Sequence, residues 1–140
     1  MAEIKLAFDQ TLKLTPLDTT QGRCLRPMLP VRLSYNENSI DLDAMVDTGA
    51  DFSHFPNYIA QSLGIPEDEL IPDTVITLKK GDSAWFCPIG ISFLGKTFNC
   101  RACFIDNRDF PAVIGRDTIF SRLKFAFRQS IGQFYISLSP

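Results

Sequence analysis

The feature that most constrains the fold is a succession of short strand-like runs separated by turn residues. "MLPVRLSY" (28–35) and "SIDLDAMV" (39–46) flank Asn-Glu-Asn, a polar turn cluster, so they predict a β-hairpin. A second hairpin is predicted within "DTVITLKKGDSAWFCPIGISF" (73–93), because glycine next to aspartate at 81–82 is a tight-turn signal. Strands at such close spacing are typical of all-β domains.

Further strands are predicted in "GKTFNCRACFID" (95–106), "PAVI" (111–114) and "GQFYISLSP" (132–140). With one or two short helices, these strands predict an all-β fold with a closed, barrel-like architecture. The chain has no linker and no internal repeat, so we expect one domain. Residues 1–27 are predicted to be an N-terminal arm or strand, and residues 28–140 the barrel domain.

Helix signals are few. "PNYIAQSLGIP" (56–66) has a proline near the helix start and a Gly-Ile-Pro stop. "RDTIFSRLKF" (116–125) allows a second short helix, with aspartate or threonine near its N-terminus. Near the start of the chain, "EIKLAF" (3–8) can form a strand, whereas residues 9–27 predict an irregular arm or loop.

Length and charge limit the classes of function. A chain of 140 residues can bury about two-thirds of its unfolded surface in one core. The net charge is −2 and Lys and Arg are scattered, so we expect no nucleic-acid partner. The N-terminus lacks the basic and apolar regions of a secretory signal, and no run approaches the roughly 18 apolar residues of a membrane helix. We therefore expect no membrane partner and a cytoplasmic location.

The four cysteines, Cys24, Cys87, Cys100 and Cys103, are expected to be free thiols. Cys100 and Cys103 form a C-x-x-C pair, but residues i and i+3 of a strand point to opposite faces. A second ligand pair with zinc spacing is missing, and the one histidine, His54, is distant in sequence. Structural thiols are therefore favoured over a metal or redox site, and no metal or cofactor is predicted.

The run "IDLDAMV" ends on Asp47-Thr48-Gly49, and a second carboxylate, Asp51, follows. Asp-Thr-Gly alone can be a simple turn, because Asp and Thr bond nearby backbone and Gly accepts a positive φ. The run turns wholly apolar before Asp47, however, so this carboxylate stands at the end of a core strand. A carboxylate in such a position must be hydrogen-bonded or paired, or its pKa is perturbed.

A second cluster, "FPAVIGRDTIF" (110–120), repeats the pattern of an apolar run that ends on a glycine. Arg116 follows, and its planar guanidinium suits bidentate pairing with a carboxylate. Asp51 and Asp117 are both candidate partners. The alternative is an ordinary surface arginine.

The motif "AMVDTGADFSHFP" (44–56), followed some sixty residues later by "AVIGRDTIF" (112–120), resembles the retropepsin-type aspartic proteases. That family includes retroviral proteases and their cellular and bacterial relatives, and the resemblance covers roughly residues 28–138. It implies that Asp47 is the catalytic aspartate, that Thr48 holds the two active-site loops together across a dimer and that Gly49 presents backbone to substrate. It also implies that Asp51 pairs with Arg116 and contacts substrate backbone, whereas Asp117 carries no catalytic role.

The chain contains one Asp-Thr-Gly and is too short for the two catalytic lobes of pepsin-like proteases. Because an aspartic dyad needs two carboxylates, the resemblance implies a homodimer in which Asp47 meets its counterpart on a two-fold axis. Ala50 completes the active-site loop where acid-optimum relatives often have serine. Alanine cannot donate a hydrogen bond to an ionised dyad, so we expect the acid limb of activity to lie at higher pH than in those relatives.

A flap that closes over substrate is expected in the second hairpin. Its predicted residues are Lys79, Lys80, Gly81, Asp82, Ser83 and Trp85. Trp85 fits the substrate cleft and core or dimer packing equally well, whereas His54 is expected to have a structural or surface role. The terminal run "QFYISLSP" (133–140) can pair with its own mate or with residues 3–8 across the interface.

The function indicated is a homodimeric aspartic endopeptidase that acts on polypeptide substrates. One alternative is an inactive member of the same fold that serves as a dimerisation or peptide-binding module. A second alternative is an unrelated β-barrel binding protein with a chance motif. Asp47-dependent binding of a pepstatin-like inhibitor separates the endopeptidase from the unrelated barrel.

Overall fold

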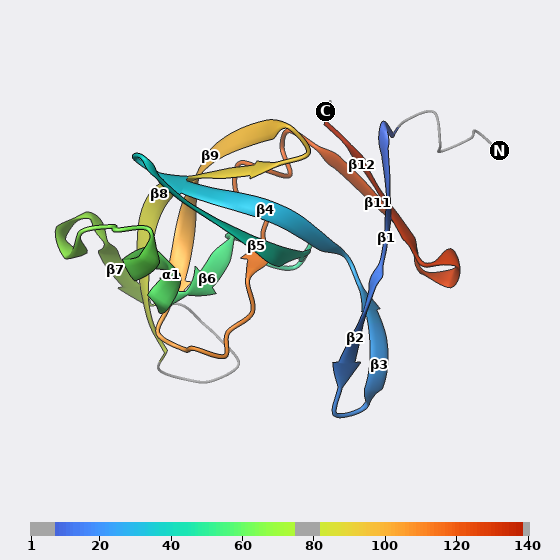
Figure 1. Cartoon of the computed structure of the whole chain (residues 1–140), viewed down its shortest axis with the longest axis horizontal. Coiled ribbons are helices and arrows are strands. Elements are labelled where there is room, and N and C mark those ends of the chain that lie inside the picture. The colour runs from blue at the N-terminus through green and yellow to red at the C-terminus, as the bar shows by residue number, and fades with distance from the viewer. Residues whose placement is uncertain (1–7, 75–81, 139–140) are drawn as a thin grey trace.

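The computed structural model describes residues 8–74 and 82–138 (Figure 1). Its strands are β1 (Gln10–Lys13), β2 (Thr15–Thr19), β3 (Gly22–Arg26), β4 (Met28–Tyr35), β5 (Asn38–Val46), β6 (His54–Pro56), β7 (Ile71–Thr74), β8 (Ser83–Phe93), β9 (Lys96–Ile105), β10 (Val113–Ile114), β11 (Lys124–Arg128) and β12 (Gln133–Ser137). The helices in this part of the chain are α1 (Asn57–Ser62) and the 3₁₀ helices η2 (Glu67–Glu69) and η3 (Gln129–Ile131). None of them is long and apolar enough to cross a membrane.

Strands β4, β5, β10, β6, β9 and β8 close into a barrel in that order, because β8 pairs with β4 as well as with β9. The 11-residue β8 is long enough to pair with β7 at its start and with β4 near its end. Alternation along β4 points every second side chain inward. Phe55, Phe98 and Phe104 are fully buried in the core. The predicted all-β barrel is confirmed.

Both predicted hairpins have paired strands. β4 and β5 pair from Met28–Met45 to Tyr35–Asn38, and Asn36 takes a positive φ of 51° in the turn between them. β7 pairs with the start of β8, although residues 75–81 of that hairpin lie outside the described residues. Helix α1 forms as predicted and is followed by Gly64 at a φ of 71°, a left-handed conformation that glycine adopts without strain.

The N-terminal arm is more ordered than predicted. Residues 3–7 lie outside the described residues, but the segment expected to be irregular contains three strands. β1 pairs with β12, which also pairs with β11, and this three-stranded sheet packs beside the barrel (Figure 1). β2 and β3 form a separate hairpin that projects beyond it. The prediction failed because most of these residues are exposed, so no apolar alternation marks the strands.

The second predicted helix, at residues 116–125, is wrong. A hydrogen-bonded turn follows Arg116, and the chain then enters β11. Thr118 has a φ of 67°, which is incompatible with a right-handed helix. The amides of Arg116 and Asp117 bond to another loop instead of starting a helix, which explains why the helical pattern was overridden.

Candidate active site

Asp47 lies at the point where β5 leaves the barrel core. β5 runs parallel to β10, with Met45 opposite Val113 and Val46 opposite Ile114. The amide of Asp47 continues this pairing and donates to the carbonyl oxygen of Ile114 at 3.0 Å. Val46 is 4% exposed, whereas Asp47 is half-buried and Thr48 is exposed. The strand therefore delivers a carboxylate from the apolar interior to the surface.

The backbone of the loop holds the Asp47 carboxylate in place. Oδ1 accepts a hydrogen bond from the Gly49 amide at 2.9 Å, and the Ala50 amide donates to the Asp47 carbonyl oxygen at 3.2 Å. A Cβ at position 49 would lie 3.3 Å from Oδ1, a tight contact that glycine avoids. Oδ2 accepts no hydrogen bond from the described residues, so this oxygen is available to a substrate, a water molecule or a second carboxylate.

The second motif is bonded to this loop by a ladder of backbone contacts. Arg116 N donates to Ala50 O at 2.9 Å, and Asp117 N donates to Asp51 O at 2.8 Å. Gly115 approaches so closely that a Cβ there would clash with the carbonyl oxygen of Phe52. The two motifs, far apart in sequence, therefore form one rigid unit around Asp47.

Ser53 is the buried side chain that completes this unit. It is 1% exposed, and its Oγ accepts a hydrogen bond from the Gly115 amide at 3.0 Å. No role was predicted for Ser53 from the sequence. The available signal was weak: a hydroxyl residue two positions after Asp51 must find a partner if the motif is packed against a second segment.

The predicted ion pair between Asp51 and Arg116 is not present among the described residues, and this prediction is corrected. Arg116 Nη1 instead donates to the carbonyl oxygen of Thr48 at 3.2 Å, while the Asp51 side chain is exposed. The guanidinium therefore fixes the backbone of the Asp-Thr-Gly turn directly. Asp51 is left facing solvent at the edge of the site, where a peptide or another chain can reach it.

His54 lies close enough to the site to be influenced by it. Its ring packs edge-to-face on Phe110, with centroids 4.8 Å apart, and Nδ1 is buried without a partner among the described residues. Burial lowers the pKa of His54, while the negative charge of Asp47 and a backbone hydrogen bond at Pro111 oppose that shift. Because β6 pairs His54 with Val113, the histidine supports the strand that leads to Gly115.

The predicted flap is only partly described. Lys79, Lys80 and Gly81 lie outside the described residues. Ser83 begins β8 opposite Thr74, and Asp82 immediately precedes this strand. The half-buried Trp85 stands between Pro72 on β7 and Phe104 on β9. These strand pairings hold the base of the hairpin in place. Its role as a flap stays a prediction.

The C-x-x-C pair is divided between two parts of the core, as the strand pattern predicted. Cys100 packs in the main barrel core, and Cys103 packs with Ala84, Phe86 and Ile105 in a second cluster. Burial raises the pKa of Cys100 to about 12 and that of Cys103 to about 11. The four cysteines are free thiols, as predicted; Cys24 is exposed and the other three are buried. Among the described residues, no group of His, Cys, Asp or Glu could hold a metal ion.

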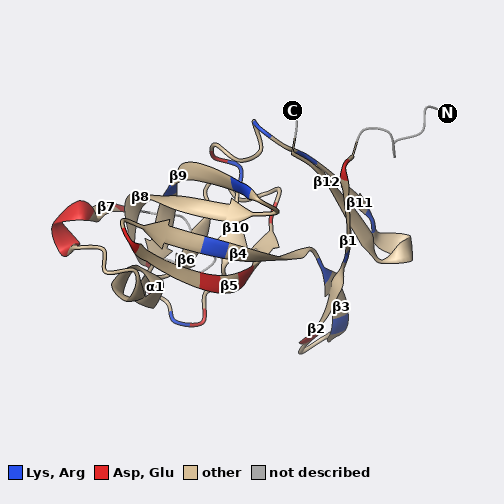
Figure 2. Cartoon of the chain, turned by 45° about the horizontal axis from the view of Figure 1, so that its top comes forward, with Lys and Arg blue, Asp and Glu red and all other residues tan. Residues whose placement is uncertain are grey.

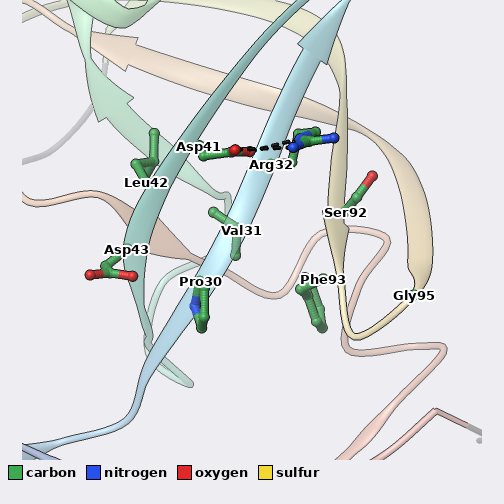
Figure 3. Close-up of a pocket in the computed structure, with 9 residues that line it drawn as sticks. All are labelled: Pro30, Val31, Arg32, Asp41, Leu42, Asp43, Ser92, Phe93 and Gly95. Atoms are coloured by element: carbon green, nitrogen blue, oxygen red, sulfur yellow. Dashed lines mark hydrogen bonds and ion pairs between the residues drawn. The ribbon is translucent and has the colours of Figure 1, made fainter.

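A cavity of about 580 Å³ lies on the barrel wall (Figure 3). It is bordered by β4, β5 and the β8–β9 turn, and an ion pair between Arg32 and Asp41 at 2.7 Å crosses it. Ion pairs of this exposed kind contribute little to stability. None of the residues that line the cavity belongs to the two motifs, so we assign it no part in catalysis.

Acidic and basic side chains are interspersed over the described surface, apart from the acidic turn η2 (Figure 2). That the chain has no nucleic-acid partner stays a prediction from the scattered charges of the sequence.

Comparison with known proteins places these motifs in context. No family model matches the chain. The chain is 30% identical over 116 residues to the Gag-Pro polyprotein of Human T-cell leukemia virus 3 (strain Pyl43), a match that covers 77% of this chain and 18% of the polyprotein. The Gag-Pro-Pol polyprotein of the same virus is also 30% identical over 116 residues, which cover 7% of its length. The chain therefore spans less than a fifth of the length of these curated relatives.

The fold is similar to that of solved proteases. A retropepsin-like aspartic protease from Rickettsia conorii matches with a TM-score of 0.60 and 18% identity, covering 91% of this chain and 98% of that one. The protease of EIAV, solved with the inhibitor HBY-793, matches with a TM-score of 0.52 and 24% identity over 65% of this chain and 82% of the protease. At these identities the likeness establishes the fold, and the predicted retropepsin fold is confirmed.

Proposed function

We propose that this chain, which has the retropepsin fold and resembles a retroviral Gag-Pro polyprotein in sequence, is an aspartic endopeptidase that acts as a homodimer. Asp47 is the catalytic residue, and each active site uses two copies of it. The substrate is a polypeptide bound in an extended conformation between the Asp47 loop and the hairpin of β7 and β8. Asp51, exposed at the edge of the loop, is placed to contact substrate backbone.

One observation carries this proposal: the loop presents the Asp47 carboxylate outward on a rigid support. Oδ1 is bonded to the Gly49 amide, whereas Oδ2 accepts no bond from the described residues. Arg116 and Gly115 fix the loop from a separate segment. A turn with a purely structural role has no need for such support from a segment that lies far away in the sequence.

The chemistry follows from electrostatics. Two ionised carboxylates about 3 Å apart repel by about 5 kcal/mol at an effective dielectric constant near 20. One proton is therefore shared between the two Asp47 side chains over a wide pH range. The ionised carboxylate takes a proton from a bound water molecule, and the protonated one polarises the scissile carbonyl. The apparent pKa values belong to the pair rather than to either residue.

The test is cleavage of a mixed peptide library by the wild type and by Asp47→Asn, from pH 4 to pH 7.5, with mass measured by sedimentation. The expected result is cleavage by a wild-type dimer and none by Asp47→Asn, because an amide cannot act as the general base. Asp43→Asn, which changes an exposed carboxylate on the same strand, is the matched control and should cleave normally.

A stable dimer that cleaves none of the peptides would contradict the endopeptidase and favour an inactive dimerisation or peptide-binding module of the same fold. Cleavage that survives in Asp47→Asn would place the chemistry on other residues.

A further inference from the structure

We propose that the β2–β3 hairpin, together with η3, forms a dimerisation arm that packs against a second copy of this chain. The inference rests on the proposed homodimer and adds a contact surface outside the Asp47 loop. The open face of the arm carries Leu17 and Cys24, which pair across its two strands.

The arm is attached to the strand end that carries the catalytic residue. β3 ends at Arg26, and the carbonyl oxygen of the next residue, Pro27, accepts a hydrogen bond from Val46 N at 2.9 Å. Asp47 follows Val46 directly. The hairpin therefore projects from the edge of the barrel where the Asp47 loop begins (Figure 1).

The hairpin receives little support from its own chain. Among the described residues its strands pair only with each other, and all their residues are exposed except Thr15. A two-stranded hairpin alone is marginally stable in water. One face is anchored, since Gln129 Nε2 on η3 donates to Leu25 O at 3.2 Å and the Leu25 side chain lies near Gly132.

The opposite face is open. Leu17 and Leu25 point to opposite faces, because Leu17 pairs with Cys24, the neighbour of Leu25, and side chains alternate along a strand. Leu17 therefore shares its face with Cys24, away from the anchored side. Both residues are exposed.

Apolar exposure is concentrated around this arm. Of the seven large apolar side chains exposed among the described residues, Leu17 at 38% and Leu25 at 37% lie on the hairpin, Phe127 at 40% lies on β11 and Ile131 at 49% lies on η3. The other three are Tyr58, Ile71 and Leu94, which lie on other elements. The hairpin and the elements beside it therefore hold four of these seven side chains, and Leu17 presents one of them on the open face.

The occupant follows from the incompleteness of the active site. One chain supplies one Asp47, so a second copy must approach the strand end where this residue lies. In a C2 dimer the segments next to the axis face the same segments or their neighbours in the partner. The arm is attached to the chain one hydrogen bond away from Val46. A second copy that approaches this strand end therefore reaches the arm before any other macromolecule does.

The experiment measures the dimer dissociation constant of Leu17→Ser by sedimentation, with Tyr58→Ser as the matched control. Tyr58 is a similarly exposed apolar residue on α1, on the other side of the barrel (Figure 1). We expect Leu17→Ser to weaken the dimer by about tenfold or more, because two buried leucines are lost per dimer. Tyr58→Ser should leave the constant unchanged.

The alkylation rate of Cys24 provides a second measurement, in the protein without substitutions. Alkylation of Cys24 by iodoacetamide should slow several-fold as the protein concentration rises through the dissociation constant, because the second copy covers the face that Cys24 shares with Leu17. This measurement also detects the contact if Leu17→Ser fails to fold.

The outcomes separate the two proposals. A wild type that dimerises and cleaves peptides, with unchanged Leu17→Ser affinity and Cys24 reactivity, overturns the arm alone. A raised KM in Leu17→Ser without any change in dimer affinity also overturns it, since the arm then contacts substrate. A wild type that is monomeric at all concentrations and inactive overturns the homodimeric protease, and the arm with it.

Discussion

Replacing Ser53 with alanine removes the side chain that connects the two motifs inside the protein. Ser53 is 1% exposed, and its Oγ is the acceptor for the Gly115 amide at 3.0 Å. Alanine leaves that amide buried and without its partner. Such a loss costs about 1–3 kcal/mol, more than the net value of an ordinary hydrogen bond.

The assay is urea unfolding at a fixed protein concentration, because a dimer's stability depends on concentration. We expect the free energy of unfolding to fall by about 2 kcal/mol, with an unchanged m-value. Peptide cleavage should fall as well, because the Gly115 segment supports the loop that presents Asp47. Ser121→Ala is the control. Its exposed Oγ donates to Thr118 O, and its loss should change stability by at most about 0.5 kcal/mol.

An unfolding free energy for Ser53→Ala that equals the wild-type value would refute this reasoning. It would mean that the Gly115 amide finds another partner at no cost. Loss of stability with full cleavage activity would refute the second part, the link from Ser53 through Gly115 to the loop.

Three further predictions concern pH and thiol reactivity. Ala50→Ser should shift the acid limb of the pH–rate profile to lower pH, because serine can donate a hydrogen bond to the ionised dyad; an unchanged limb would reject this. Burial lowers the pKa of His54, so the folded state binds fewer protons than the unfolded state below about pH 6.5. The contribution of His54 to the free energy of unfolding should therefore be complete above that pH. It should fall as the pH drops toward the lowered pKa, by at most about 1.4 kcal/mol per pH unit. Urea unfolding of His54→Phe should lack this loss. At protein concentrations below the dimer dissociation constant Cys24 should alkylate rapidly while Cys100 and Cys103 stay protected, which peptide mass mapping can check; equal rates would contradict their burial.

Strands that bury one face could be predicted from the sequence. β4 and β5 alternate apolar and polar residues, and a short polar turn joins them, so both their location and their pairing follow from the pattern. The division of Cys100 and Cys103 between two core clusters follows from the same rule. The position of Asp47 at the end of a core strand could also be predicted, because the apolar run continues up to this residue.

Elements determined by contacts distant in sequence could not be predicted in this way. β2 and β3 have almost no buried side chains, so nothing in their composition distinguishes them from an irregular loop. The segment after Arg116 has a helical pattern, but its first amides bond to Ala50 and Asp51, and Thr118 turns left-handed. These contacts exist only after the two motifs meet.

The Arg116 contact illustrates the same limit at the level of one side chain. A guanidinium near two carboxylates suggests an ion pair, and Asp51 was the natural choice. In the folded chain the backbone ladder brings Arg116 to the Thr48 carbonyl instead. Residue type predicted a carboxylate partner for Arg116, whereas the acceptor in the folded chain depends on the geometry of the ladder.

The central claim is that each active site contains Asp47 from two chains, and subunit mixing tests it most directly. Wild type and Asp47→Asn are combined in varying proportions at constant total concentration, dissociated and reassociated, and assayed for peptide cleavage. With equal affinities, activity should follow the square of the wild-type fraction, so an equal mixture retains about a quarter of the full activity. A linear decline, with about half the activity at equal mixing, would show that each chain acts with its own Asp47 alone and would contradict the account.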